Sequence, residues 1–546
     1  MPTYLRYFII ALLSALLFIP FLGQVHLFDW DEINFAECAR EMIVSKDYLR
    51  MQIDFRPFFE KPPLFIWLQV LSMKLFGVNE FAARFPNALA GITTLIALFY
   101  IGRQTVNEKM ATWWVVLYAA TWLPHFYFKT GIIDPLFNLF IFLAFFQVHC
   151  LRFSGRKVMH VLLAGLFIGL AVLTKGPVAI VVCLLSLGVY FILNRGLKQY
   201  KILHLLGIAL VALLVTASWF GVEILQHGFT FIGEFLDYQA GLFSQNIADH
   251  AEPWYYHPVV LLIGCFPASA FLFQFTRRRT ADQQTTLDFT RWMWILFWVV
   301  LILFSIVKTK IVHYSSLCYY PMTFLAALQL YRLSEKQVVL KKGVKVLLLC
   351  LASLWALVLI ALPLVGLNKQ KLIPLIQDPF AVGNLQAVVS WSPWECTIGI
   401  LYLLGTITGI LLLKRRFVVG MRLLALVQIL AIQVTMLHFT PKIEAYSQRA
   451  AIEFYESKQG QPVYIQVLGF RSYAHLFYAH KQPAQSPRYY NEEWLLSGRL
   501  DKPAFFVVKI QDADQYRKHP LLKMRYEKNG FVFFERLPLG VKTTQP

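Results

Sequence analysis

The feature that most constrains this chain is a series of long apolar segments, which recurs from the first residues to about residue 440. A helix that crosses a lipid bilayer needs about 20 mainly apolar residues. Thirteen segments meet this requirement, at approximately 5–25, 86–103, 111–128, 132–151, 159–174, 176–193, 202–221, 256–276, 290–307, 313–332, 345–366, 396–413 and 419–438. The sequence therefore predicts an all-α polytopic membrane protein with about 13 transmembrane helices.

Charge is scarce and unevenly placed. Only 15% of the residues are charged, against roughly 25% in soluble proteins. The formal net charge of +20 would suit a nucleic-acid partner, but many of the basic residues lie in loops between the predicted spans, where they orient a membrane protein. We therefore expect membrane lipid as a partner and no nucleic acid. Seven scattered Cys without CxxC spacing predict neither a metal cluster nor a disulfide framework.

Alternate loops differ in their content of Lys and Arg. Every second loop, beginning with the N-terminus, is basic, whereas the loop 222–255 contains no Lys or Arg. Basic loops stay on the cytoplasmic side of a membrane. The pattern predicts a cytoplasmic N-terminus and places everything after about residue 440 outside. The first segment lacks a cleavage site, so we interpret it as an uncleaved span.

Two domains are predicted. Residues 1–440 form the transmembrane domain, with long outer loops at 26–85 and 222–255. In the first loop, residues 31–45 have the spacing of an amphipathic helix lying on the membrane surface, capped by Asp29 or Asp31. Residues 441–546 are polar and predict a small α/β domain, with strands at 462–470, 503–510 and 531–535 and a hairpin turn at 528–530.

Several cations occupy predicted outer loops, where the topology rule disfavours them. They are Lys61, Arg84, Lys175, Lys308 and Lys310. A single Lys there can simply extend its ammonium group to the interface. Together, five cations on one face predict a site for an anionic phosphate or pyrophosphate headgroup, which Lys binds as a point charge.

Acidic residues share the same predicted face. Asp31 and Glu32 follow the first span, and Asp134 precedes Pro135 at the start of the fourth. Asp31 and Asp134 can be read as helix caps. The alternative is that a carboxylate acts as general base or charge stabiliser during glycosyl transfer, while the cations stabilise the departing phosphate.

His250 lies in an aromatic loop and could bind a metal together with Glu60 or Glu252. It could equally be a hydrogen-bonded residue of the membrane interface. The chain has no P-loop, GxGxxG or GxSxG motif, which argues against a nucleotide cofactor and against a serine hydrolase.

An ordered set of motifs resembles a known group of enzymes. The motifs are Asp31-Glu32 with Phe35-Ala36-Glu37 and Arg40-Glu41-Met42, Glu60-Lys61-Pro62, Asp134-Pro135, Thr174-Lys175-Gly176, His250 to Tyr256, Lys308-Thr309-Lys310 before Tyr314, and Tyr320-Pro321. Together they resemble the lipid A aminoarabinose transferases and the broader protein-O-mannosyltransferase-like superfamily. The resemblance covers about residues 25–330.

The resemblance implies a GT-C membrane glycosyltransferase in a bacterial inner membrane, with an undecaprenyl-phosphate sugar donor and a cavity facing the periplasm. It implies Asp31 near the catalytic centre, Lys61 on the donor phosphate, and a divalent metal (Zn²⁺, Mg²⁺ or Mn²⁺) held by Glu60 and His250. One departure leaves the sugar and the acceptor open, because Ala251 and Glu252 follow His250 where the relative has a basic residue.

The leading hypothesis is an inverting glycosyltransferase that moves a sugar from a polyprenyl-phosphate donor to lipid A or another envelope glycolipid or protein. The predicted catalytic residues are Asp31, Glu32 and Asp134; the predicted phosphate-binding residues are Lys61, Arg84, Lys175, Lys308, Lys310 and Tyr314. The alternatives are a lipid-linked sugar flippase, a protein O-glycosyltransferase, and a partner-docking protein that acts through its soluble tail.

Overall fold

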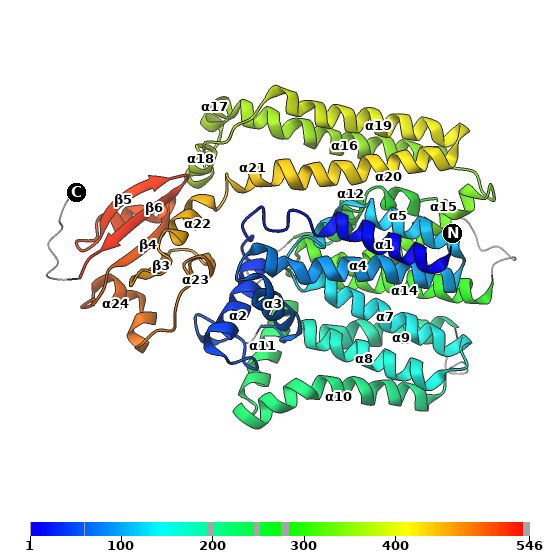
Figure 1. Ribbon diagram of the computed structural model, residues 1–546, viewed down its shortest axis with the longest axis horizontal. Coiled ribbons are helices and arrows are strands. Elements are labelled where there is room, and N and C mark those ends of the chain that lie inside the picture. The colour runs from blue at the N-terminus through cyan, green and yellow to red at the C-terminus, as the bar shows by residue number, and fades with distance from the viewer. Residues whose placement is uncertain (1, 59, 195–199, 245–251, 275–282, 539–546) are drawn as a thin grey trace.

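The computed structural model describes residues 2–58, 60–194, 200–244, 252–274 and 283–538. The long helices run side by side in one bundle, and a sheet domain lies at one end of it (Figure 1). The N-terminus lies at the far end of the bundle from that domain. The predicted all-α membrane protein with a small C-terminal domain is confirmed.

Within the described ranges, eight helical segments are long and apolar enough to cross a membrane. They are α4 (Glu80–Thr105), α7 (Asp134–Phe153), α8 (Lys157–Lys175), α10 (Ile202–His227), α14 (Gln284–Ile306), α16 (Lys342–Leu367), α19 (Cys396–Arg415) with the turn before it, and α20 (Phe417–Val434) continued through a π-helical turn into α21 (Thr440–Glu444). Each coincides with a predicted span.

The other five predicted spans are short or interrupted. The short helices are α1 (Thr3–Phe18) and α9 (Val178–Asn194), and the interrupted pairs are α5 (Glu108–Ala119) with α6 (Trp122–Tyr127), α12 (Tyr256–Gly264) with α13 (Ala268–Leu272), and the 3₁₀ helix η3 (Val312–Cys318) with α15 (Tyr319–Ser334). Pro267, which has no backbone N–H to donate, stands at one break. The count of thirteen spans stays a prediction.

The predicted outer loops carry helices of their own. Helix α2 (Asp31–Ser45) has the predicted bounds, and it is followed by the hairpin β1 (Gln52–Ile53) and β2 (Arg56–Pro57) and by α3 (Leu64–Phe76). Every residue of α2 from Glu32 to Met42 is buried, which is at odds with a helix lying flat on a membrane surface. The reason is that α2 packs between α3 and the C-terminal domain. The other outer loop contains α11 (Thr230–Ser244).

The C-terminal part folds around a four-stranded sheet. Its elements are α22 (Arg449–Glu456), β3 (Tyr464–Leu468), α23 (Ala474–Tyr478), α24 (Glu492–Ser497), β4 (Ala504–Lys509), α25 (Ala513–Arg517), β5 (Lys523–Lys528) and β6 (Phe531–Arg536). The strand order is β3-β4-β6-β5, with β3 and β4 parallel and the other pairs antiparallel. The three predicted strands correspond to β3, β4 and β6. Asn529 and Gly530 form the hairpin turn with φ of 50° and 81°, as a type I′ turn requires.

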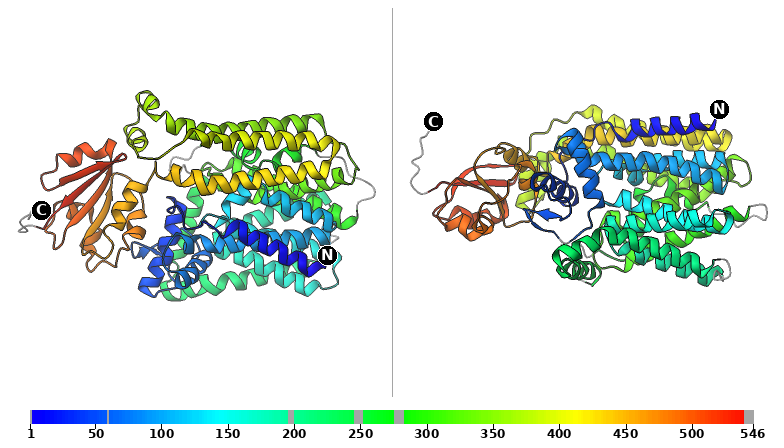
Figure 2. Two further views of the ribbon diagram at one scale, coloured as in Figure 1. Left: turned by 45° about the horizontal axis from the view of Figure 1, so that its top comes forward. Right: turned by 60° about the horizontal axis from the view of Figure 1, so that its bottom comes forward.

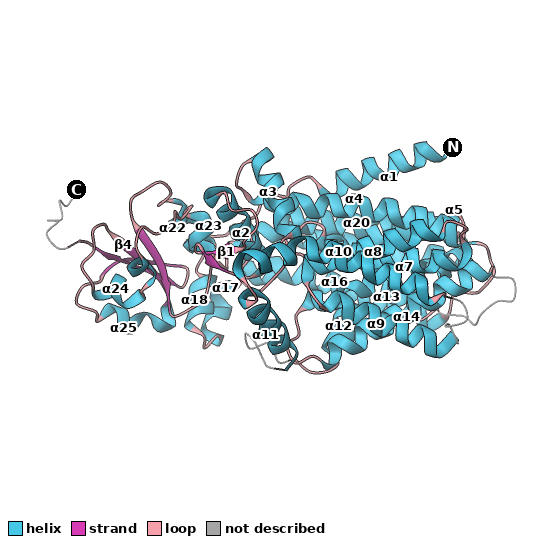
Figure 3. Ribbon diagram, turned by 90° about the horizontal axis from the view of Figure 1, so that it is seen from below, coloured by secondary structure: helices cyan, strands magenta, loops and turns pink. Residues whose placement is uncertain are grey.

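One apolar cluster joins this domain to the bundle. It combines Ile33 and Met42 of α2 with Ile452 of α22 and Phe477 of α23, all of which are fully or almost fully buried. Helix α17 (Lys369–Leu372) follows α16, and the next helix, α18 (Pro379–Leu385), lies beside the same domain (Figure 2). The view from below shows α2, α11 and α23 gathered at this end of the bundle (Figure 3). The predicted outer loops thus share one end of the molecule.

Candidate active site

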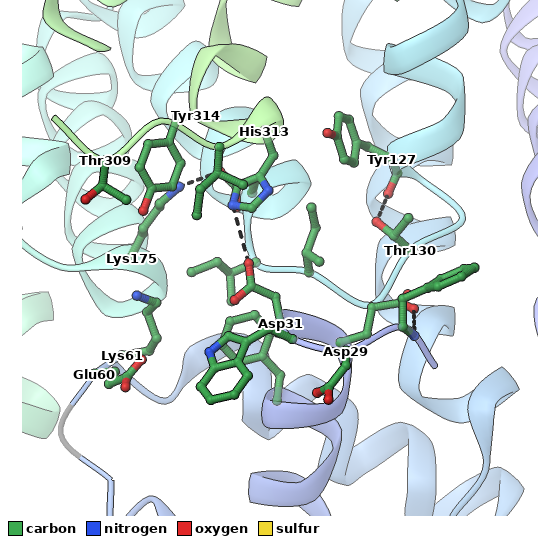
Figure 4. A pocket seen from close by; sticks show the side chains of 18 of the residues that line it. Asp29, Asp31, Glu60, Lys61, Tyr127, Thr130, Lys175, Thr309, His313 and Tyr314 are labelled. Carbon is green, nitrogen blue, oxygen red and sulfur yellow. Dashed lines mark hydrogen bonds and ion pairs between the residues drawn. The ribbon is translucent and has the colours of Figure 1, made fainter. Parts of the chain in front are cut away.

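A cavity of about 1110 Å³ opens where the bundle meets the C-terminal domain (Figure 4). Many parts of the bundle line it, among them α2, the segment before α3, α6, α7, α8, α11 and η3. Arg471 and Lys509 of the C-terminal domain complete the lining. Of the predicted site residues, Asp31, Glu32, Glu60, Lys61, Asp134, Lys175 and Tyr314 line this one cavity.

Four ionisable side chains form a chain of contacts across the cavity wall. The His313 Nε2 atom lies 3.4 Å from Asp31 Oδ2 and 3.8 Å from Asp134 Oδ2. The other oxygen of Asp134 pairs with the ammonium group of Lys175. The Asp31 side chain is 29% exposed, whereas that of Asp134 is 4% exposed. Of these two carboxylates, Asp31 is therefore the one that a substrate in the cavity can reach.

Helix ends position these groups. Asp134 is the first residue of α7 and Asp31 is the first residue of α2, but neither caps its helix, because the cap positions belong to Ile133 and Trp30 and no side-chain cap bond forms. Lys175 ends α8, and Gly176 follows it with a φ of +84°. The alternative reading of both acids as caps therefore fails, and their carboxylates are free to face the cavity.

Lys61 is held from the opposite side by α11. Its ammonium group lies 5.3 Å from the centre of the Tyr238 ring, and the Tyr238 hydroxyl donates a 2.8 Å hydrogen bond to Glu60. Burial lowers the pKa of Lys61, although Glu60 and Asp31 oppose this shift. An ammonium group with little solvent around it gains more from a bound phosphate than an exposed one would.

Glu32 and Arg84 form a buried ion pair with two hydrogen bonds. Arg84 donates from Nε and Nη2 to the two Glu32 oxygens at 2.9 and 2.8 Å, and its remaining N–H groups reach the carbonyls of Leu22, Val25 and His26. All five guanidinium donors are thus occupied. Arg84 does not line the cavity. This geometry argues against the predicted phosphate-binding role of Arg84.

The hydrogen-bonding capacity of the Glu32 carboxylate is also used up within the protein. Besides Arg84, its oxygens accept hydrogen bonds from the backbone N–H groups of Phe28 at 2.8 Å and Gly131 at 2.5 Å. The carboxylate is buried and ties three segments together. The geometry therefore favours a structural role for Glu32 over the catalytic role predicted from the sequence.

The two lysines of the Lys308-Thr309-Lys310 loop face elsewhere. Lys308 is exposed, and Lys310 is buried close to His257. The cavity lining includes their neighbours Thr309 and Ile311 but neither lysine. Tyr314 does line the cavity, with its ring centre 5.0 Å from the Lys175 ammonium group.

Sequence reasoning missed several cavity residues. His313 stood beside Tyr314, and an ionisable residue in a short loop already marked by two lysines could have drawn attention to it. No local sequence pattern marks Tyr238, Arg471 or Lys509 as cavity residues. Only the tertiary fold brings α11 and the C-terminal domain to the cavity. Ala251 and Glu252 follow His250 where the similar enzymes have a basic residue. Arg471 and Lys509 partly replace that charge, because they supply cations at the cavity.

Asp29 adds a titratable group next to these cations. Burial raises the pKa of Asp29 to about 6, and the nearby Asp31 adds to the increase, while Ser472 and Lys509 oppose it. The Trp30 ring packs against Tyr473 with centres 5.1 Å apart, which fixes this segment against the C-terminal domain. The charge of this part of the cavity therefore changes near neutral pH.

Of the two residues predicted to bind a metal, Glu60 and His250, the structure describes only Glu60. Glu60 lines the cavity, but His250 lies outside the described residues. The Glu60 carboxylate is oxygen-donating and reachable, so its chemistry fits a divalent cation. The metal stays a prediction.

This arrangement suits transfer of a group from a phosphate. Ammonium groups and hydroxyls can bind a phosphate and stabilise it as it leaves with negative charge. A reachable carboxylate, oriented by an imidazole, can take a proton from an incoming hydroxyl. Both elements face one enclosed space.

Comparison with known proteins agrees with this chemistry. Residues 60–220 match the family model described as dolichyl-phosphate-mannose-protein mannosyltransferase. An undecaprenyl phosphate-alpha-4-amino-4-deoxy-L-arabinose arabinosyl transferase from Edwardsiella ictaluri is 28% identical over 73% of this chain and 76% of its own length. The protein of the same description from Shewanella sediminis is 28% identical over 58% of each chain.

The fold has a close counterpart among solved structures. The crystal structure of ArnT from Cupriavidus metallidurans bound to undecaprenyl phosphate superimposes with a TM-score of 0.78 and covers 98% of each chain at 18% identity. Its apo structure gives a TM-score of 0.73 at the same identity. The fold, the family match and the sequence relatives agree: this chain has the GT-C fold of a membrane glycosyltransferase and is similar to the aminoarabinose transferases and the protein mannosyltransferases.

Proposed function

We propose that this enzyme transfers a sugar from a polyprenyl-phosphate donor to an envelope glycolipid such as lipid A. The observation that carries the proposal is the single cavity into which Asp31, Asp134, Lys61 and Lys175 converge. Support also comes from sequence relatives described as undecaprenyl phosphate-aminoarabinose arabinosyl transferases and from the fold of ArnT, which was solved with undecaprenyl phosphate. The enzyme would lie in a bacterial inner membrane, with the cavity and C-terminal domain in the periplasm.

The donor phosphate would bind between Lys61 and Lys175. Asp134 fixes the Lys175 ammonium group, and Tyr314 lies against it. The two ammonium groups would stabilise the negative charge that develops on the phosphate as the bond to the sugar breaks. Lys61 is the stronger candidate for direct contact, because it has no carboxylate partner within ion-pair distance among the described residues.

Asp31 would act as the general base. Its carboxylate is the more exposed of the two that face His313. It would take the proton of the acceptor hydroxyl as that oxygen attacks the anomeric carbon, opposite the departing phosphate. The His313 ring would orient the carboxylate, as a hydrogen-bond donor does for a catalytic base. Attack from the opposite face inverts the anomeric centre.

A flippase is the rival from another class. Transporters of this kind place ionisable groups near the bilayer midplane, on the substrate path. The ionisable groups of the cavity instead lie at one end of the bundle, where α2, α11 and the C-terminal domain meet (Figure 1). Another buried charge cluster is satisfied internally, because Asp288 accepts hydrogen bonds from His149 at 2.8 Å and from Arg152 and Tyr190 at 2.5 Å. These observations favour an enzyme with access from one side.

The direct test is reconstitution. Purified protein in lipid nanodiscs is incubated with a panel of polyprenyl-phosphate sugars and with lipid A, and the mass of the acceptor is followed. We expect an increase by one sugar residue with at least one donor. Flipping of the donor in liposomes without any transfer would instead support the flippase. Transfer to a protein substrate but not to lipid A would favour a protein O-glycosyltransferase, which the family description makes the second candidate.

The metal at Glu60 and His250 is tested in the same assay. If a divalent cation is required, chelation by EDTA abolishes transfer and added Zn²⁺, Mg²⁺ or Mn²⁺ restores it. Glu60→Gln should then weaken the response to the added metal, because it removes the charged ligand. Full activity after exhaustive chelation would exclude a catalytic metal.

A further inference from the structure

A second group of ionisable side chains lies where the C-terminal domain meets the bundle. His26 precedes α2, Glu80 begins α4, and Glu456 ends α22. One nitrogen or oxygen atom from each lies within 4.8 Å of the others. None of the three lines the cavity described above. The group is therefore separate from the proposed site of glycosyl transfer.

The imidazole of His26 is held in one orientation. Its Nδ1 atom lies 3.0 Å from Glu444 Oε1, and the other oxygen of Glu444 accepts a 2.7 Å hydrogen bond from Arg449 Nε. The Tyr478 ring packs edge-on against the imidazole at 5.5 Å, and its hydroxyl accepts the Leu27 N–H at 2.7 Å. Histidines that bind metals typically donate their second ring N–H to a carboxylate in this way. In the neutral imidazole, Nε2 is then left with a free lone pair.

The free Nε2 faces carboxylates. It lies 3.9 Å from Glu456 Oε1, and Glu80 completes the group. No Lys or Arg in the described part of the chain forms an ion pair with Glu80 or Glu456. Two carboxylates and one imidazole thus meet without a cation among the residues that the structure describes. Such a set of one nitrogen and two oxygen donors suits a divalent transition metal.

We propose that His26 Nε2 and the carboxylates of Glu80 and Glu456 bind a divalent transition-metal ion, of which Zn²⁺ is the best match. Zinc bonds to nitrogen and carboxylate oxygen are about 2.0–2.2 Å long, and water can occupy the fourth position. The glutamate side chains must therefore move inward by roughly an ångström. They can do so because the Glu456 side chain is 42% exposed and Glu80 is half-buried.

The ion would join three parts of the protein at one point. It would tie α22 of the C-terminal domain to α4 and to the segment that leads into α2. Arg84 binds the carbonyl of His26 and also the carboxylate of Glu32, so the same segment sets the start of the helix that carries Asp31. The metal would act as a structural clamp between the domains.

Zinc binding by the full-length protein in nanodiscs tests the proposal. After EDTA treatment and removal of the chelator, Zn²⁺ is titrated at pH 8, and bound zinc per chain and the melting temperature are measured. We expect the melting temperature to rise by several degrees with the wild type. Glu80→Gln and Glu456→Gln should each lose one zinc equivalent and most of that rise.

Matched controls separate this site from others. Glu453 lies on the same helix as Glu456 but pairs with Lys528. The Glu453→Gln variant should therefore bind zinc like the wild type. Glu60→Gln removes the predicted metal at the cavity and should leave the thermal shift intact. The proposal fails if Glu80→Gln and Glu456→Gln bind as much zinc as the wild type. It also fails if zinc never stabilises the protein, which would mean that a protonated His26 alone neutralises the two carboxylates.

Discussion

Asp31 and Glu32 are neighbours in the sequence, yet their carboxylates have different partners. Glu32 is buried and accepts four hydrogen bonds, two of them from Arg84. Asp31 is partly exposed to the cavity and faces only His313 within ion-pair distance among the described residues. The turn at the start of α2 produces this difference, because it directs successive side chains about 100° apart.

Substitution should separate the two roles. Asp31→Asn keeps the shape but removes the base, so we expect turnover to fall by about 10²- to 10⁴-fold with an unchanged melting temperature. Glu32→Gln leaves the buried Arg84 without its charge partner and should destabilise the protein by about 3–5 kcal/mol. Transfer assays and thermal unfolding of both variants provide the test. An active Asp31→Asn enzyme would exclude Asp31 as the base.

Asp29 should make acceptor binding depend on pH. Its pKa is raised to about 6, so the carboxyl is largely neutral below pH 6 and negatively charged above it. The neutral form no longer offsets the nearby Lys509. We therefore expect the KM for a phosphorylated acceptor to be lower at pH 5 than at pH 7.5.

Asp29→Asn is the matched variant for this effect. The amide is neutral throughout, so the KM should stay low across the same pH range. A pH dependence of KM that survives in Asp29→Asn would assign the titration to another group.

At the scale of the elements, the site depends on helices that end or break near the cavity. Helix α7 begins with Asp134, α8 ends with Lys175, and η3 interrupts the apolar segment that contains His313. Irregular backbone inside a membrane protein is tolerated where it lines a cavity or is enclosed by protein. Because the helices end or break here, the polar groups of these segments lie at the cavity. In continuous spans the same residues would lie elsewhere.

Gly176 makes the approach of α11 to this region possible. Its φ is +84°, and a Cβ atom there would lie 2.7 Å from the Phe235 ring of α11. Gly176→Ala should strain the backbone by about 1–2 kcal/mol and also displace α11, which carries Tyr238. We expect a lower melting temperature together with a reduced kcat/KM.

Gly228→Ala supplies the control for that substitution. Gly228 also has a positive φ, of +71°, but a Cβ atom there would meet open space. Only the backbone strain should remain, so the melting temperature should fall while kcat/KM stays near that of the wild type. Equal losses of activity in both variants would mean that the contact with Phe235 does not matter.

At the scale of the whole molecule, the C-terminal domain contributes side chains to the cavity of the proposed active site. Arg471 and Lys509 reach the cavity from it, and the apolar cluster around α2 attaches the domain to the bundle. A phosphorylated acceptor would enter past these two cations. The domain is therefore expected to be needed for activity rather than to act as a separate docking module.

Arg471→Ala and Lys509→Ala test this role. Each removes a charge contact of about 1 kcal/mol, so the KM for a phosphorylated acceptor should rise about fivefold, with kcat little changed. Lys523→Ala on the exposed strand β5 is the control and should have no effect. If a dephosphorylated acceptor shows the same increase, the two residues do not recognise phosphate.

The sequence predicted individual residues of the site with mixed outcome. Among the predicted residues, Asp31, Lys61, Asp134, Lys175 and Tyr314 line one cavity. The sequence could group them because the loop charges correctly indicate which segments share one end of the bundle. Arg84 and Lys308 do not line this cavity, because charge on the same side of a bundle does not specify direction. Arg84 points into a network of carbonyls, and Lys308 points to the exterior.

The sequence alone determined the class of protein, the position of most helices and three of the four strands of the small domain. Those features follow from local patterns: apolar length, alternation of loop charge and turn residues. The tertiary structure alone decided that α2 is enclosed, that His313 joins Asp31 to Asp134, and that Arg471 and Lys509 reach the cavity. These depend on contacts between residues hundreds of positions apart, which pack through buried surface and carry no local periodicity.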